Sequence, residues 1–488
     1  MKKLVLLFAA IACLQIAVGQ EWKITTGADS KALQYHKNKG VRSRMPGYIG
    51  HRNGTTYIMG FYDEVKTKAY LAAYDKDLNA LGKVDLPSEE NQTLYGGFAN
   101  EKSIDLLMTQ KDASEYTAYK LSYDPSTLQP KGEPKALVSF NRGDGNKTYT
   151  YVSSSQSQEW LSLIFAVVEE DNVEWLVGLY DTELEEFWSM EFHQEIIDDY
   201  FVTDSGEVVV AGFYEKKNSD ETRLQFAILD GEREQAYVCN EVLPKMRNME
   251  IVRYEDGKIY CTGLLVGEAQ DDKGYWNSGF YSLVYDTRAK RMVKFEKVDF
   301  SKEDICDLCN ASRNLRLKVL STDKLRFADS HYDNDGTTVL FERTYNFFLD
   351  YAFVHSEYVG ILAYRIDKQG HIAWHCILMR DLQAPNGIEN NVKTRLTPMG
   401  DAYTIFYMDL PGNVNAKEGK TVTIAPLERS KLGLMATSID RQGNVKRSML
   451  TVPPKSVPIG APHLLDNGDY LLLLARPFNS NIATLKYE

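Results

Sequence analysis

Residues 204–230 read DSGEVVVAGFYEKKNSDETRLQFAILD, and these residues show the pattern from which the fold can be predicted. A polar turn with a glycine leads into an apolar segment, a polar hairpin follows, and a second apolar segment ends at an aspartate. β-Branched and aromatic residues dominate both apolar segments, and no helical periodicity is present. The stretch therefore predicts two neighbouring strands of an antiparallel sheet.

The same pattern recurs along the whole chain, which indicates a repeat architecture. Segments equivalent to the first apolar strand of this stretch lie at 55–62, 103–109, 160–167, 207–214, 258–266, 324–332, 402–408 and 469–475. The strand that follows ends at an aspartate in seven units, at Asp75, Asp124, Asp181, Asp230, Asp286, Asp367 and Asp440, and the eighth spans 481–487. An aspartate there accepts backbone N–H groups two residues on and stabilises a tight turn into a further strand. We therefore expect units of four short strands, in which these two are the second and third.

A four-stranded unit has two faces and cannot bury both alone, whereas radial stacking of many units buries them and protects the edges. The chain is therefore predicted to be all-β, with residues 20–488 forming a single β-propeller. The motif count favours eight blades; seven blades plus an irregular unit is the alternative, because the later units are long. The competing arrangement is two stacked sandwich domains, but no linker or change in composition divides the chain.

The last unit ends at its third strand, while residues 21–26 (EWKITT) have strand character and no partner of their own. We expect these residues to complete the last blade and close the ring.

Residues 204–230 and 361–378 resemble the repeat of secreted bacterial β-propeller proteins, in which a Gly-containing turn, an apolar strand, a hairpin and an Asp-x-x-Gly-x-x-x-Trp ending follow one another. Asp367, Gly370 and Trp374 carry that ending in full. The resemblance covers nearly all of the chain after the N-terminal segment, and it implies an architecture and not an activity. Quinoprotein-like propellers have a related ending with an additional Thr, which is absent here, so no cofactor is predicted.

The N-terminal segment has the three parts of an export signal. Lys2 and Lys3 supply the positive charge, residues 4–18 are apolar, and Ala17 and Gly19 are small residues at the positions that signal peptidase reads. We therefore predict a signal peptide at 1–19 and an exported, periplasmic or secreted chain that starts at Gln20. Acylation of Cys13, giving an outer-membrane lipoprotein, is the alternative. The apolar run is too short to span a membrane, and no other segment approaches that length.

The net charge argues against one class of partner. The chain carries 56 basic and 68 acidic side chains, a formal charge of −12. A surface with this average charge repels a phosphate backbone, so nucleic acid is not an expected partner.

Several motifs of enzyme chemistry are absent from the sequence. Gly-x-Ser-x-Gly and the sialidase Asp-box do not occur. The chain has 68 acidic residues, so the sequence does not exclude a pair of carboxylates suited to glycoside hydrolysis. Only the geometry of the folded chain could identify such a pair. The predicted function is a non-enzymatic module that binds a carbohydrate or an envelope or extracellular protein, or serves as a scaffold; a carbohydrate-active hydrolase is the alternative.

Two short motifs have local interpretations, and no metal site is predicted. Asp333, Asp335, Gly336 and Glu342 match part of a calcium-loop spacing, but a hairpin turn explains the same residues. Cys306 and Cys309 are too few for a zinc site without a second pair. A local disulfide and two thiols both remain open for them.

The ligand surface is predicted on the face that carries the loops between second and third strands. These loops are longest in the fifth to seventh units, at 267–278, 333–357 and 409–431, beside connectors 301–314 and 381–391. Long loops in a compact fold are commonly functional. The candidate ligand-binding residues are Tyr275, Trp276, Tyr345, Phe348, Tyr351 and His355, with Trp276 and Tyr351 as anchors. The alternative is that these aromatic side chains pack on one another.

Overall fold

The structure is a computed structural model. It describes residues 22–26, 47–61, 69–87, 89, 91–112, 114–141, 147–169, 172–192, 197–215, 222–241, 243–267, 276–309, 325–350, 353–385, 394, 396–399, 401–415, 433–450, 457–465, 468–475 and 480–487. Within the strands, some side chains lie outside this description, including those of residues 22–26, 276, 344–350 and 353–359.

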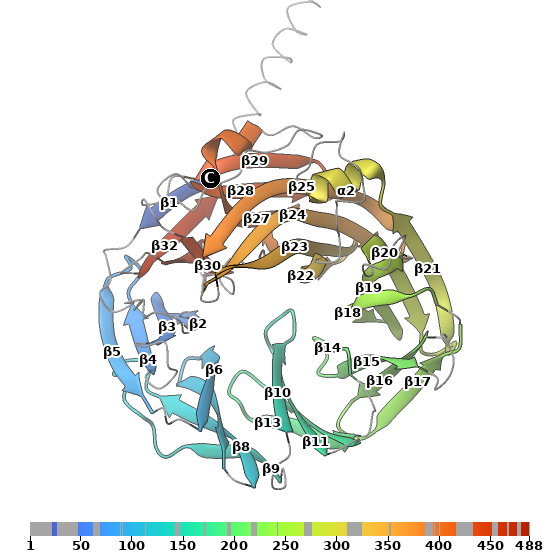
Figure 1. The fold of residues 1–488 in the computed structure, drawn as a ribbon. Helices are drawn as coiled ribbons and strands as arrows, with labels where there is room; N and C mark the ends of the chain where they lie inside the picture. The colour runs from blue at the N-terminus through green and yellow to red at the C-terminus, as the bar shows by residue number, and fades with distance from the viewer. Residues whose placement is uncertain are drawn as a thin grey trace, which may run out of the picture.

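The described strands form eight antiparallel sheets of four strands each, arranged as a ring around a central axis (Figure 1). The first strand of each blade lies innermost and the fourth strand outermost. The chain is therefore an eight-bladed β-propeller, as the repeat predicted.

Blades 1 to 4 use consecutive strands in chain order. Their bounds are β2(Gly47–Arg52), β3(Thr55–Phe61), β4(Ala69–Tyr74) and β5(Ala80–Leu86) in blade 1; β6(Gln92–Ala99), β7(Ile104–Lys111), β8(Glu115–Tyr123) and β9(Lys135–Asn141) in blade 2; β10(Lys147–Ser154), β11(Leu161–Glu169), β12(Asn172–Tyr180) and β13(Glu186–Phe192) in blade 3; and β14(Asp199–Val202), β15(Val208–Glu215), β16(Thr222–Leu229) and β17(Glu234–Cys239) in blade 4.

Blades 5 to 7 follow the same order, and blade 8 combines both ends of the chain. Their bounds are β18(Met246–Glu255), β19(Lys258–Gly267), β20(Trp276–Asp286) and β21(Arg291–Asp299) in blade 5; β22(Leu325–Asp333), β23(Gly336–Asp350), β24(Phe353–Asp367) and β25(Ile372–Pro385) in blade 6; β26(Leu396–Met399), β27(Ala402–Asp409), β28(Gly433–Asp440) and β29(Val445–Leu450) in blade 7; and β30(Val457–Leu464), β31(Tyr470–Ala475), β32(Ser480–Tyr487) and β1(Trp22–Thr26) in blade 8.

The ring closes by pairing between the two ends of the chain. Strand β1 lies antiparallel to β32, with Trp22 opposite Tyr487 and Thr26 opposite Ala483. This register supplies the fourth strand that the last repeat lacks, so the predicted closure is confirmed. It also removes two open sheet edges.

Helical structure is scarce among the described residues. Helix α2(Lys302–Leu308) lies between blades 5 and 6 and begins with a capping box between Ser301 and Asp304, and η4(Pro411–Asn415) follows β27. Cys306 is buried within α2, and Cys309 caps its C-terminus. No described helix is long and apolar enough to cross a membrane.

The aspartates at the ends of third strands act as the sequence predicted. In blade 7, Oδ1 of Asp440 accepts the backbone N–H groups of Gln442 at 2.9 Å and Asn444 at 2.8 Å. The corresponding aspartates also accept two backbone N–H groups each, one from two residues on and one from three or four residues on; they are Asp75, Asp124, Asp181, Asp230, Asp286 and Asp367. Each carboxylate thus fixes the turn to the outermost strand.

The hydrophobic core lies between neighbouring blades. One cluster joins Val209 and Phe226 of blade 4 to Ile251, Cys261 and Leu283 of blade 5. The second and third strands supply most of the buried residues, and all six residues of β4 are buried. Because burial of a large apolar side chain contributes about 2 kcal/mol, blade-to-blade packing and not any single sheet stabilises the ring.

Two predictions in blade 6 are wrong. Residues predicted as the second strand at 324–332 belong to β22, which is the first strand of that blade. The long loop predicted at 333–357 is instead a tight turn followed by most of the hairpin of β23 and β24, in which Tyr345 pairs with Glu357 and Phe348 with Val354. A run of aromatic and polar residues without clean alternation hid these strands in the sequence.

Candidate functional site

The innermost strands of blades 3 to 5 carry an unusual set of tyrosines and carboxylates. Strand β14 has only four residues, whereas the neighbouring first strands β10 and β18 have eight and ten. The face of β10 directed at blade 4 is therefore covered over only part of its length. Tyr149 and Tyr151 lie on this face and remain 47% and 41% exposed, although they belong to an inner strand of a packed ring.

Strand β14 lies between blades 3 and 5, and its side chains point alternately toward one blade and toward the other. Tyr200 points to blade 3, where its ring lies 6.2 Å from that of Tyr151 in an edge-to-face contact. Asp199 points to blade 5, where its Oδ2 accepts the backbone N–H of Ile251. The short strand thus carries an aromatic side chain directed at blade 3 and a carboxylate directed at blade 5, on its opposite faces.

Asp198, Asp199 and Glu250 form what we call the acidic site. Burial raises the pKa of Asp199 to about 7, and the nearby charge of Asp198 adds to this, while the N–H of Ile251 acts in the opposite direction. Burial and the charge of Asp199 raise the pKa of Glu250 to about 9. Both side chains keep partial access to solvent. At neutral pH the pair therefore holds at least one proton between two carboxyl groups.

The acidic site has no basic partner in the part of the chain that the structure describes. No Lys, Arg or His of the described ranges forms an ion pair with any of its three carboxylates. The titratable groups that interact with it are Tyr200, Cys261, Tyr281 and Tyr364, none of which is a base in its ordinary state.

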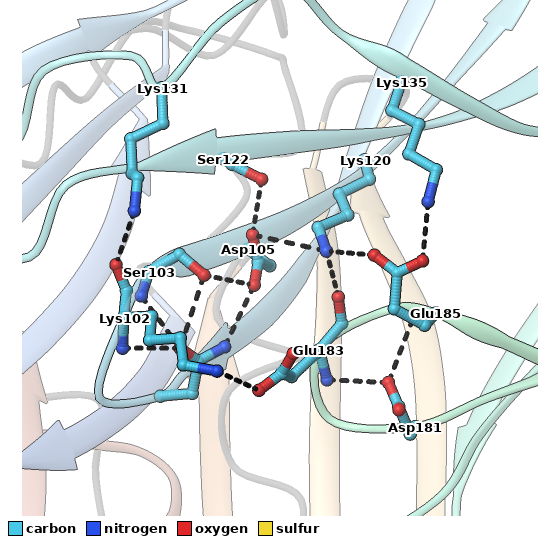
Figure 2. Close-up of polar contacts among 11 residues, drawn as sticks. Lys102, Ser103, Asp105, Lys120, Ser122, Lys131, Lys135, Asp181, Glu183 and Glu185 are labelled. Carbon is cyan, nitrogen blue, oxygen red and sulfur yellow. Dashed lines mark hydrogen bonds and ion pairs between the residues drawn. The ribbon is translucent and has the colours of Figure 1, made fainter.

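Figure 2 shows the opposite arrangement, a compensated polar network between blades 2 and 3. Asp105 is fully buried, and it accepts hydrogen bonds from Ser103 at 2.7 Å and Asn100 at 3.0 Å, with Nζ of Lys120 3.9 Å away. Nζ of Lys120 also forms an ion pair with Oε1 of Glu185 in the next blade, at 3.0 Å. Since these carboxylates have donors or cations around them, we interpret this network as a structural link between blades.

A buried hydroxyl group without a described partner lies beside the acidic site. Tyr281 of β20 is fully buried, and no described group hydrogen-bonds its hydroxyl. Its ring passes over Gly263, where a Cβ would come within 2.8 Å of the hydroxyl and of the carbonyl oxygen of Asn248. Burial raises the pKa of Tyr281, and the charges of Glu250 and Asp198 are among the further causes. The hydroxyl therefore reaches the bulged part of β18 that precedes Glu250.

Contacts at the other end of the first strands hold blades 3 to 6 together. The side chain of Gln156 hydrogen-bonds the backbone of Tyr332, and the Tyr332 hydroxyl donates to Asp204. The guanidinium of Arg253 lies over the ring of Tyr332, 5.8 Å from its centroid. These contacts fix the relative positions of the inner strands that carry the tyrosines and the acidic site.

The aromatic residues that the sequence singled out belong to blades 5 and 6. Trp276 begins β20, Tyr345 and Phe348 lie in β23, and His355 lies in β24, opposite Phe347. Their side chains lie outside the described residues, as do Tyr275 and Tyr351 altogether. Their role in binding stays a prediction.

Sequence reasoning did not select the residues of the inner strands. A signal was present, because residues 147–154 read KTYTYVSS, with two tyrosines on one face of a strand, and residues 198–200 read DDY. Either pattern alone is common on strands, and only the ring brings Tyr151, Asp199 and Glu250 from three blades to one region.

Similarity to known proteins is limited to solved structures. The chain matches no protein family model, and no curated protein matches it. The β-propeller domain of the Trilobed protease from Pyrococcus furiosus is 10% identical, with a TM-score of 0.36 over 84% of this chain and 99% of that chain.

Two lyases have a similarly low identity and TM-score to this chain. Polysaccharide lyase Uly1 is 9% identical, with a TM-score of 0.39 over 92% of this chain and 90% of that chain. An oligogalacturonate lyase from Vibrio parahaemolyticus is 9% identical, with a TM-score of 0.36 over 96% of this chain and 98% of that chain. Similarities at this level carry no argument about activity, and the assignment to the β-propellers rests on the eight sheets.

Proposed function

We propose that this β-propeller binds a carbohydrate at an inner surface formed by Tyr149, Tyr151, Tyr200 and the acidic site. The observation that carries the proposal is the exposure of Tyr149 and Tyr151, at 47% and 41%, on the innermost strand of their blade. Exposed tyrosines on a rigid inner strand lose little conformational entropy when they contact a ligand.

The chemistry of these side chains suits a sugar. Aromatic rings stack on the apolar C–H faces of pyranose rings, and phenol hydroxyl groups bind the ring substituents. Carboxyl groups of Asp199 and Glu250 accept hydrogen bonds from sugar hydroxyls and, when protonated, also donate them. An apolar wall with a few convergent polar groups is the usual composition of a small-molecule site.

A glycan array followed by calorimetric titration of each positive glycan tests the proposal. Tyr149→Ala and Tyr151→Ala should weaken binding by about 1 to 3 kcal/mol each. Phe187→Ala is the matched control, because Phe187 is 58% exposed on the outer strand β13. Binding that is unchanged in both tyrosine variants contradicts the proposal.

The aromatic residues of blades 5 and 6 are the second candidate surface for the same function. Trp276→Ala and Tyr351→Ala belong in the same titrations, where a loss of affinity confined to these variants assigns binding to the loops between second and third strands. A protein partner at that face, the alternative occupant, is detected as a stable complex in a pull-down with envelope extract.

A carbohydrate-active hydrolase is the second candidate function, and the raised pKa values of two neighbouring carboxyl groups favour it. A carboxyl group that is protonated near neutral pH is suited to act as a general acid, and its partner as a base or nucleophile. Asp199 and Glu250 are the residues assigned to this pair. A screen with polysaccharides and chromogenic glycosides should show turnover that Asp199→Asn and Glu250→Gln each abolish, whereas no turnover of any substrate favours binding alone.

A further inference from the structure

The surface that carries the inner tyrosines changes from exposed to buried along strand β10. The pairing of β10 with β11 is regular over its whole length, so alternate residues of β10 lie on one face. On the face of the tyrosines, Lys147 is exposed, Tyr149 and Tyr151 are 47% and 41% exposed, and Ser153 is half-buried. Ser155, directly after the strand, is only 2% exposed. Access to this surface therefore decreases toward the C-terminal end of β10.

Strand β14 shows the same change in the same direction. Asp198, which precedes the strand, is exposed, Tyr200 is half-buried and Val202 is 2% exposed. Both β10 and β14 are first strands of blades with the same strand order, so both run toward the same face of the ring. Since the ring of Tyr200 contacts that of Tyr151, the two strands line one surface, and this surface becomes buried at one end.

Contacts between blades 3, 4 and 6 close this end. We call Gln156, Phe201, Asp204 and Tyr332 the inner cap. Gln156, two residues beyond β10, hydrogen-bonds the backbone of Tyr332 at 2.6 and 2.9 Å. The ring of Tyr332 lies 6.1 Å from that of Phe201 in β14, and its hydroxyl donates to Asp204. Because Phe201 directly follows Tyr200, the inner cap lies at the C-terminal end of the surface that carries the tyrosines.

A surface that is closed at one end restricts how a polymer binds to it. The rise of about 3.3 Å per residue places Ser153 about 13 Å beyond Tyr149 along β10. A chain that lies along Tyr149 and Tyr151 therefore meets the inner cap after a few sugar rings. The interior of a long polysaccharide would have to continue past both ends of the surface, and the inner cap blocks one of them.

We propose that the inner surface recognises the free end of a linear glycan chain, with the terminal sugar between Tyr151, Ser153 and the inner cap and the preceding rings along Tyr149. This inference rests on the proposed carbohydrate-binding function. It assigns Ser153 as a residue that determines specificity for chain ends, because its side chain lies where the terminal sugar stops.

Pairs of probes with the same sugar and linkage separate end recognition from carbohydrate binding as such. The pairs are maltoheptaose with amylose and tetragalacturonate with polygalacturonate, and β-cyclodextrin is a glucan without ends. Calorimetric titration should give at least one oligosaccharide an affinity, expressed per sugar residue, about tenfold or more above that of its polymer, because the polymer offers few ends. β-Cyclodextrin should not bind.

Ser153→Tyr places a large ring at the closed end, so it should lower the affinity for the bound oligosaccharide about tenfold or more. Ser154→Tyr is the matched control, because Ser154 is exposed on the opposite face of β10, and it should leave the affinity unchanged. Melting temperatures of both variants check that the ring is intact. Should Ser153→Tyr lose structure, the probe pairs decide the test on the wild-type protein.

The outcomes of this test are distinct from those of the proposed function. Equal affinity per sugar residue for an oligosaccharide and its polymer, or binding of β-cyclodextrin, overturns end recognition; weakening of that binding by Tyr151→Ala then supports carbohydrate binding. No binding of any probe also overturns end recognition, and the glycan array then decides the proposed function independently.

Discussion

The side-chain amide of Gln156 hydrogen-bonds both polar backbone groups of Tyr332, a residue 176 positions further along the chain. Nε2 donates to the carbonyl oxygen at 2.6 Å, and Oε1 accepts the N–H at 2.9 Å. The inner edge of a first strand has no neighbouring strand, so its N–H and C=O groups need other partners. One glutamine from blade 3 supplies both for blade 6.

Gln156→Ala should lower the free energy of unfolding by about 1 to 3 kcal/mol, because two hydrogen bonds are lost and the backbone groups of Tyr332 lose their partner. Gln442→Ala, in an exposed turn of blade 7, is the control. Urea unfolding followed by tryptophan fluorescence measures both. Equal midpoints for Gln156→Ala and the wild type would show that this contact does not stabilise the ring.

The stability of the protein should depend on pH through the acidic site. The folded-state pKa values of Asp199, about 7, and Glu250, about 9, lie above the ordinary values near 4, so the folded chain holds protons that the unfolded chain releases. The unfolding free energy should therefore fall as pH rises from about 4 through 9, by about 2 kcal/mol or more.

Urea midpoints at pH 5, 7 and 9 check this dependence. Asp199→Asn and Glu250→Gln should each flatten it, because amides do not ionise. A stability that rises between pH 5 and 9 in the wild type and in both variants would show that the two groups are not protonated in the folded state.

Asp440→Ala should destabilise the turn between β28 and β29. The carboxylate accepts backbone N–H groups of Gln442 and Asn444 and the side-chain amide of Asn444 at 2.8 Å. Its loss should cost about 1 to 2 kcal/mol, measured by urea unfolding, whereas Asp440→Asn keeps one acceptor oxygen and should cost about half as much. A larger cost for the Asn variant would contradict the role as backbone acceptor.

The pairing of β1 with β32 should determine whether the ring stays closed. Ile24 pairs with Leu485 in the middle of this short ladder. Ile24→Pro removes an N–H donor and restricts the strand backbone, so it should lower the melting temperature by several degrees, while Ile24→Val should have little effect. Equal melting temperatures for the Pro and Val variants would mean that β1 contributes little to closure.

We also propose export with cleavage before Gln20, on the basis of the positive and apolar segments that precede it. Intact-mass measurement of the protein recovered from the periplasm or the medium should give a chain that starts at Gln20. A mass that corresponds to acylated Cys13 would support the lipoprotein alternative instead.

Local chemistry allowed the blades to be predicted from the sequence. Alternating apolar residues and the aspartates at Asp75, Asp367 and Asp440 specify strands and turns through contacts a few residues apart. The same logic failed at 333–357, because the aromatic residues of β23 and β24 follow no clean alternation and extend beyond the length of an ordinary blade strand.

The acidic site could not be predicted in this way. Tyr151, Asp199 and Glu250 come from three blades, and their arrangement follows from the four-residue length of β14 and the irregular pairing of β18 with β19. Such lengths and bulges are set by packing between blades, not by local preference. The repeat, the turns and the closure of the ring could therefore be predicted from the residues alone. The positions of the polar residues around the inner strands could not, because contacts there form across blade interfaces between residues far apart in the chain.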